Sequence, residues 1–82
     1  SDMYCLASFG HLLVKTKQYA KAILYLEKYT SKLKNHLNIN ALTDLALSYY
    51  YSYEYFKALD LFQLLSKLTP QNTTLNKYQR EN

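Results

Sequence analysis

The sequence predicts an all-α protein in which two helical hairpins stack on each other, and three observations support this. The 82 residues contain one Gly and one Pro, which favours long helices over turns and sheets. Apolar residues recur at spacings of three and four, as on one face of a helix. The same pattern of residue types also appears twice, 36 positions apart, and such a period is typical of stacked helical hairpins.

The two copies of the pattern occupy residues 6–29 and 42–65, and every gap between matched positions agrees. The first copy consists of Leu6, Phe9, Gly10, Leu13, Tyr19, Ala22, Ile23, Leu26 and Tyr29. The second consists of Leu42, Leu45, Ala46, Tyr49, Tyr55, Ala58, Leu59, Phe62 and Leu65. One hairpin leaves an apolar face that only a neighbouring hairpin can cover, so we expect the two copies to stack.

Each copy is expected to contain two helices. The helices should span residues 2 or 3–15, 18–33, 39–51 and 54–68. Asn38 or Asn40 can cap the third helix, because an amide side chain accepts a hydrogen bond from a free backbone N–H. Pro70 should end the fourth helix, because the residue before a proline is pushed out of helical geometry. Residues 72–78 can form a short capping helix with Leu75 and Tyr78 on one side.

Small residues are predicted to bring the two helices of each hairpin close together. Gly10 costs about 1 kcal/mol relative to Ala inside a helix, so its presence indicates a close contact with the second helix. The other predicted core residues of the helices include Phe9, Tyr19, Tyr49, Tyr55, Phe62 and Leu65.

The pattern resembles the tetratricopeptide repeat, a helix–turn–helix unit of about 34 residues. The positions that carry the resemblance are Phe9-Gly10, Leu45-Ala46, Tyr19, Tyr55, Ala22, Ala58 and Pro70. The chain departs from the family at Lys34, where the first copy lacks the closing proline. The resemblance implies one domain with repeats at about 3–36 and 39–70 and a cap or tail at 71–82.

The resemblance also implies a concave surface lined by the first helix of each repeat. By register, this surface holds Tyr4, Ala7, His11, Val14 and Lys15 in the first repeat, and Asn40, Thr43, Leu47, Tyr50 and Tyr51 in the second. Some family members clamp a carboxylate-ended peptide here with Lys and Asn, which this chain lacks at the corresponding places. The remaining lining is apolar and aromatic, which suits the apolar face of an amphipathic helix. The alternative is that these residues pack within the stack or under the C-terminal tail.

We therefore expect a protein–protein interaction module, a chaperone or assembly partner that sequesters an amphipathic helix of another protein. In fold and size the chain is similar to the small repeat-type chaperones of bacterial type III secretion, which implies a needle or translocator subunit as partner and a second small helical co-chaperone. The alternatives are an architectural segment of a larger scaffold and a basic RNA-associated repeat. Two repeats leave an outer face uncovered, so the isolated chain should be marginally stable or self-associate.

Charge favours a protein partner over nucleic acid. The net charge of +4 is concentrated in residues 1–34, where Lys21, Lys28 and Lys32 lie on one side of the predicted second helix with Tyr25 between them. A basic stripe with an aromatic residue can bind RNA. Lysines on the outer face of a surface helix are usually solvated, however, and the chain has no nucleic-acid motif. An acidic protein partner is therefore favoured over RNA.

The residue pattern supports neither catalysis nor a bound metal or cofactor. One Cys, two His and six carboxylates show no metal-ligand spacing, and there is no glycine-rich phosphate loop. Cys5 is expected to be a small apolar residue. No apolar run predicts a membrane span, and a lone Cys needs no oxidising compartment, so we expect a cytoplasmic protein. Met3 after Ser1-Asp2 and a polar end at 76–82 favour a complete short protein over a segment of a longer one.

Overall fold

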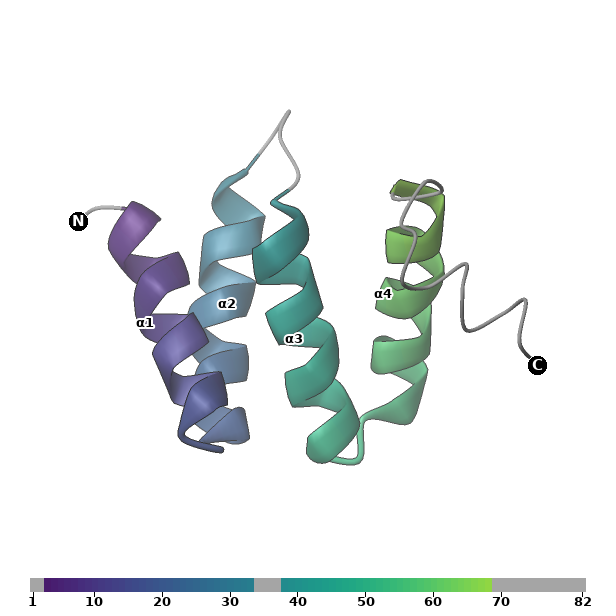
Figure 1. The fold of residues 1–82 in the computed structure, drawn as a ribbon, viewed down its shortest axis with the longest axis horizontal. Coiled ribbons are helices and arrows are strands. Elements are labelled where there is room, and N and C mark those ends of the chain that lie inside the picture. The colour runs from purple at the N-terminus through teal and green to yellow at the C-terminus, as the bar shows by residue number, and fades with distance from the viewer. Residues whose placement is uncertain (1–2, 34–37, 69–82) are drawn as a thin grey trace.

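The computed structural model describes residues 3–33 and 38–68, which form four α-helices in two hairpins (Figure 1). The helices are α1 (Met3–Lys15), α2 (Tyr19–Lys32), α3 (Ile39–Tyr51) and α4 (Tyr55–Leu68). Helix α1 packs on α2 and α3 packs on α4, and α3 also packs on both helices of the first hairpin. The predicted all-α class and the two stacked hairpins are confirmed, and each helix begins and ends within one residue of its predicted bounds.

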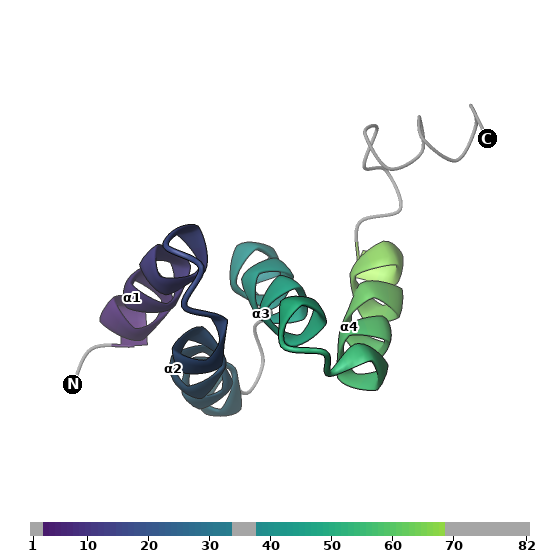
Figure 2. The same cartoon turned by 90° about the horizontal axis from the view of Figure 1, so that it is seen from below.

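The four helices stand in a row, so that α1 and α4 form its two ends (Figure 1). Seen from below, α1 and α3 lie on one side of the row and α2 lies on the other (Figure 2). The first helices of the two hairpins therefore share one surface. The connection at 34–37, the predicted stop at Pro70 and the predicted helix at 72–78 lie outside the described residues.

The two hairpins turn in the same way, down to their hydrogen bonds. In the first turn the Lys17 N–H donates to Val14 O at 3.0 Å and the Gln18 N–H donates to Leu13 O at 2.8 Å. In the second turn the equivalent Tyr53 N–H donates to Tyr50 O at 3.1 Å, and the Glu54 N–H donates to Tyr49 O at 2.8 Å. Lys17 and Tyr53 have φ of 64° and 67°, the left-handed conformation that ends a helix in this motif. The repeat thus extends from residue types to backbone geometry.

Asn38 joins the two hairpins where α3 begins. Its Oδ1 accepts a hydrogen bond from the Ala41 N–H at 3.1 Å, which confirms it as one of the two predicted N-caps. Its Nδ2 donates to the Tyr29 hydroxyl on α2 at 3.0 Å. A single side chain therefore caps α3 and holds that end of α3 against the first hairpin.

The core lies where α1, α2 and α3 meet, and α4 contributes Ala58 to it. Its buried side chains are Leu13, Ala22, Leu26, Tyr29, Ala41, Leu45, Tyr49 and Ala58. Leu26 is fully buried, and a Cβ placed on Gly10 would lie 2.6 Å from its Cδ2 atom. This is the close contact between α1 and α2 that the sequence predicts at Gly10.

Some positions that are buried or half-buried on α2 are exposed on α4, so part of the predicted core was wrong. Phe62, the repeat equivalent of the fully buried Leu26, is 38% exposed, and Tyr55 is exposed as well. The reason is that α3 covers α2, whereas no other helix of the described chain covers the equivalent face of α4. Phe9 on α1 is exposed at the opposite end of the row, because no other helix of the described chain covers that face of α1.

Substitution of Gly10 tests the close contact between α1 and α2. We expect Gly10→Ala to lower the free energy of unfolding by about 1–3 kcal/mol despite the better helix propensity of Ala, because the new methyl group overlaps Leu26. In the Leu26→Ala background the same change should be neutral or stabilising, because the methyl group then enters the space that Leu26 leaves. Urea unfolding of the four variants of this cycle measures the coupling, and additive effects would contradict the contact.

Tyr49 links the two hairpins through a polar contact. Its hydroxyl on α3 donates a hydrogen bond to the Glu27 carboxylate on α2. Burial, and then the bond to Glu27, raise the pKa of the Tyr49 phenol well above its usual value. A raised pKa means that the folded state favours the neutral phenol, so this contribution to stability is present below about pH 10 and is lost as the pH rises further.

The Tyr49→Phe variant should separate the stability that comes from the hydrogen bond to Glu27 from the pH dependence that comes from the raised pKa. At neutral pH we expect the free energy of unfolding to fall by about 1–2 kcal/mol, because the Glu27 carboxylate loses a partner. Above about pH 10 the stability of the wild type should fall more steeply than that of the variant, because only the wild type has this phenol to ionise. The exposed Tyr53 provides the control, since Tyr53→Phe should keep the wild-type pH slope. Equal slopes for the wild type and Tyr49→Phe would refute the assignment.

Candidate partner-binding groove

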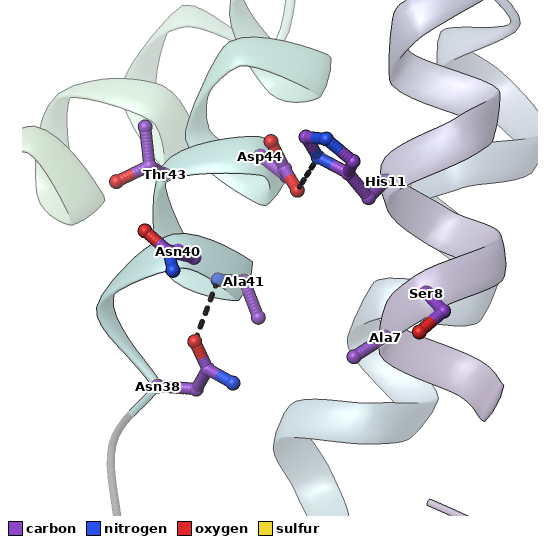
Figure 3. A pocket seen from close by; sticks show the side chains of 8 residues that line it. All are labelled: Ala7, Ser8, His11, Asn38, Asn40, Ala41, Thr43 and Asp44. Carbon is purple, nitrogen blue, oxygen red and sulfur yellow. Dashed lines mark hydrogen bonds and ion pairs between the residues drawn. The ribbon is translucent and has the colours of Figure 1, made fainter. Parts of the chain in front are cut away.

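A depression of about 370 Å³ opens on the surface that α1 and α3 share. Its lining consists of Ala7, Ser8 and His11 from α1, and Asn38, Asn40, Ala41, Thr43 and Asp44 from the start of α3. The two sets of side chains lie on opposite sides of the depression (Figure 3). It therefore belongs to both hairpins and depends on how they stack.

A side-chain pair bridges the depression. His11 Nδ1 lies 2.8 Å from Asp44 Oδ2, and the Asp44 side chain is 12% exposed against 56% for His11 (Figure 3). A carboxylate with so little contact with water needs a partner, and the opposite hairpin supplies it. The pair therefore holds α1 and α3 together at the floor of the groove.

Asp44 is a site residue that the sequence reasoning missed. It shares one face of α3 with Ala41, Leu45 and Ser48, all of them buried. This face, at spacings of three and four, meets the first hairpin. A carboxylate within such an apolar stripe is the signal that could have identified it, because buried charges are paired. Its partner could have been sought among the polar residues of the helix at 3–15.

The structure brings three of the eight predicted groove residues to the depression, namely Ala7, His11 and Thr43. Asn40, expected on the same surface, also lines it. Val14 on α1, and Leu47 and Tyr50 on α3, continue the same helix faces at spacings of three and four. Val14 and Leu47 are half-buried and Tyr50 is exposed.

One predicted groove residue is placed differently, and the side chain of another is not described. Tyr51 stacks on Tyr19 of α2, with ring centroids 4.9 Å apart, so it lies toward the turn of the first hairpin and not in the groove. The side chain of Tyr4 lies outside the described part of α1. Lys15, expected on the same surface, is exposed at the end of α1.

The groove changes character along its length. At the start of α3 its lining is polar, with the His11–Asp44 pair, Asn40 and Thr43, although the register alone had predicted an apolar and aromatic lining. Beyond the depression, the same faces of α1 and α3 continue with the apolar residues Val14, Leu47 and Tyr50. Neither Lys nor Arg lines the depression, so its described lining lacks the Lys that clamps a peptide carboxylate.

A cluster of exposed tyrosines lies at the end of α3 and the start of α4. Tyr50 packs edge-on against Tyr51 and Tyr55, with centroid distances of 5.2 and 5.5 Å, and Tyr53 packs against Tyr55 at 6.2 Å. All four rings are exposed. Clustered exposed aromatic rings are typical of contact surfaces. The cluster links the groove to the turn between α3 and α4.

The lysines of the predicted basic stripe do not line the groove. Lys21, Lys28 and Lys32 are exposed on α2, but Tyr25 between them is half-buried and packs edge-on against Phe9 at 4.8 Å. The described residues hold no group of three or more potential metal ligands, and within them no helix has the length and apolarity to span a membrane. Comparisons with protein-family models, curated proteins and solved structures find no match for this chain.

A double-mutant cycle tests the pair that bridges the groove. His11→Ala should lower the free energy of unfolding by about 1–3 kcal/mol, because it leaves the poorly solvated Asp44 carboxylate without its partner. In the Asp44→Ala background the same change should cost much less. Ser8→Ala, in the same depression, is the matched control and should change stability by less than about 0.5 kcal/mol. Additive effects at His11 and Asp44 would contradict the coupling.

Proposed function

We propose that this protein is a protein–protein interaction module that binds an amphipathic helix of a partner in the groove between α1 and α3. The observation that supports the proposal is the polar depression at His11 and Asp44, next to which the same faces of α1 and α3 continue with the apolar residues Val14, Leu47 and Tyr50. An amphipathic helix that crosses such a surface can bury apolar side chains at one end and satisfy polar groups at the other.

The groove also limits what the partner helix can carry. Its apolar anchors should recur at i, i+3 or i+4, and i+7, because only those positions share one face. At the polar end, Asp44 favours a neutral or cationic side chain, and a peptide carboxylate would meet no Lys or Arg in the lining. The proposed ligand is therefore an internal helical segment and not an extended chain terminus.

The proposed biological role is that of a chaperone or assembly partner. Such a protein covers an apolar helix that would otherwise drive self-assembly of its client, and a role of this kind places it in the cytoplasm. The similarity to the small repeat-type chaperones of bacterial type III secretion rests on fold, size and groove. It makes a needle or translocator subunit the first client to test, with a second small helical co-chaperone as a further partner.

Selection from a displayed library of helical peptides about 20 residues long tests the groove. We expect the selected peptides to share anchors at i, i+3 or i+4, and i+7, and to shift the amide NMR signals of Ala7, Val14, Thr43 and Leu47. Leu47→Asp should weaken their binding about tenfold or more, because a charge replaces an apolar contact at the centre of the surface.

Phe56→Asp is the matched control, because Phe56 is 87% exposed on α4 and does not line the groove; binding should persist in this variant. Circular dichroism of each variant checks that helicity is retained. Selected peptides that are extended, or that end in an essential carboxylate, would contradict the proposal. Binding that collapses between low and moderate salt, with shifts at Lys21, Lys28 and Lys32, would instead favour the RNA-associated alternative.

A further inference from the structure

The internal repeat identifies two surfaces that are buried in the middle of the molecule and open at its ends. A shift of 36 residues relates each position of the first hairpin to one of the second. Since both hairpins have the same backbone turns, a difference in burial between equivalent positions reports the presence or absence of a neighbour. This comparison can be made at both ends of the row.

The first open surface is on α4. On α2, the equivalent face is buried or half-buried, and it meets α3 through the Tyr19–Tyr51 stack and the Glu27–Tyr49 hydrogen bond. The residues of that α2 face are Tyr19, Ile23, Leu26, Glu27 and Thr30. Their equivalents on α4, which we name the tail face, are Tyr55, Leu59, Phe62, Gln63 and Ser66, and all five are exposed.

The second open surface is on α1. On α3, the residues that meet the first hairpin are Ala41, Asp44, Leu45 and Ser48, and all four are buried. Their equivalents on α1, which we name the head face, are Cys5, Ser8, Phe9 and Leu12, and all four are exposed. A hollow of about 500 Å³ opens beside the head face between α1 and α2, and its apolar lining includes Phe9, Leu12, Leu24 and Tyr25.

We propose that a second copy of this chain covers these surfaces, with the tail face of one copy packed on the head face of the next. The interface between α2 and α3 already joins equivalent faces within one molecule, and the open faces continue it by one repeat. Each copy carries both halves of this contact, with the same spacing along each helix as in the internal interface. Of the residues on the two faces only Ser8 also lines the groove between α1 and α3, and the contact can form whether or not the groove binds a helix.

The contact between copies differs from the internal one in its polar groups. By the shift of 36 residues, Gln63 of one copy takes the place of Glu27 and Leu13 of the next takes the place of Tyr49, so this hydrogen bond is lost. In the same way, Leu47 of one copy and Ser8 of the next take the places of His11 and Asp44. Apolar contacts of Leu59 and Phe62 with Phe9 and Leu12 would therefore dominate. A contact between two different faces does not close on itself by two-fold symmetry, so assemblies should lengthen as the concentration rises.

Analytical ultracentrifugation of the full chain from about 1 μM to about 1 mM tests this association. The average mass of the wild type should rise with concentration. Leu12→Glu on the head face and Leu59→Glu on the tail face should each weaken self-association about tenfold or more, because a charge enters an apolar contact. Both positions are more than half exposed, at 53% and 52%, so both variants should keep wild-type helicity.

Mixing the two variants gives the decisive measurement. Leu12→Glu keeps an intact tail face and Leu59→Glu keeps an intact head face, so an equimolar mixture should form heterodimers and nothing larger. Phe56→Glu is the control: Phe56 is 87% exposed and its equivalent Ala20 is also exposed, so it should associate as the wild type does. Cys5→Arg and Ser66→Arg are a second pair that blocks the two faces and keeps the large apolar side chains Phe9, Leu12, Leu59 and Phe62.

Three results would overturn the proposal. A wild type that stays monomeric over the whole range would show that the open faces do not bind each other. Association that survives Leu12→Glu but not Leu59→Glu would indicate contact between two tail faces. Failure of the two folded variants to pair in the mixture would exclude a head-to-tail contact, even if the wild type self-associates.

Discussion

The close approach of α1 and α2 at Gly10 and Leu26 is the contact on which the rest of the structure depends. Without a Cβ at Gly10, the Leu26 side chain packs directly on α1 and is fully buried. The two helices then present one continuous surface to α3, which packs on both. His11 follows Gly10 directly, so this packing also places the imidazole within reach of Asp44. The groove therefore depends on a contact that lies beneath it.

Features that depend on neighbouring residues in the chain were predictable, and those that depend on a covering helix were not. The helix bounds and the Asn38 cap follow from local chemistry and agree with the structure. The exposure of Tyr55 and Phe62 does not follow, because a repeat pattern states which positions are buried only when the next hairpin is present. The position of α4 as the last helix of the second copy already indicated that no third hairpin of the pattern would cover it.

The groove was predicted in part for a similar reason. The register placed Ala7, His11 and Thr43 correctly on the surface shared by α1 and α3. It could not place both Tyr50 and Tyr51 there, because successive helical residues point about 100° apart and only one can continue the face. It also overlooked Asp44, which lies on the neighbouring stripe of α3 and lines the groove, where it pairs with His11. The polar end of the groove arises from contact between hairpins, which a pattern within one hairpin does not contain.

The proposed association between copies and the proposed helix binding would reinforce each other. If copies stack as the hairpins do, α1 of one copy lies beside α3 of its neighbour and the groove continues across the joint. Leu47 and Ser8 would meet there in place of His11 and Asp44, so the joint would be less polar than the groove within one chain. A partner helix long enough to cross it would contact two copies and gain from their effective concentration. By linkage, the same partner would strengthen the stacking by an equal factor, so assembly of this protein and capture of its partner would be one coupled equilibrium.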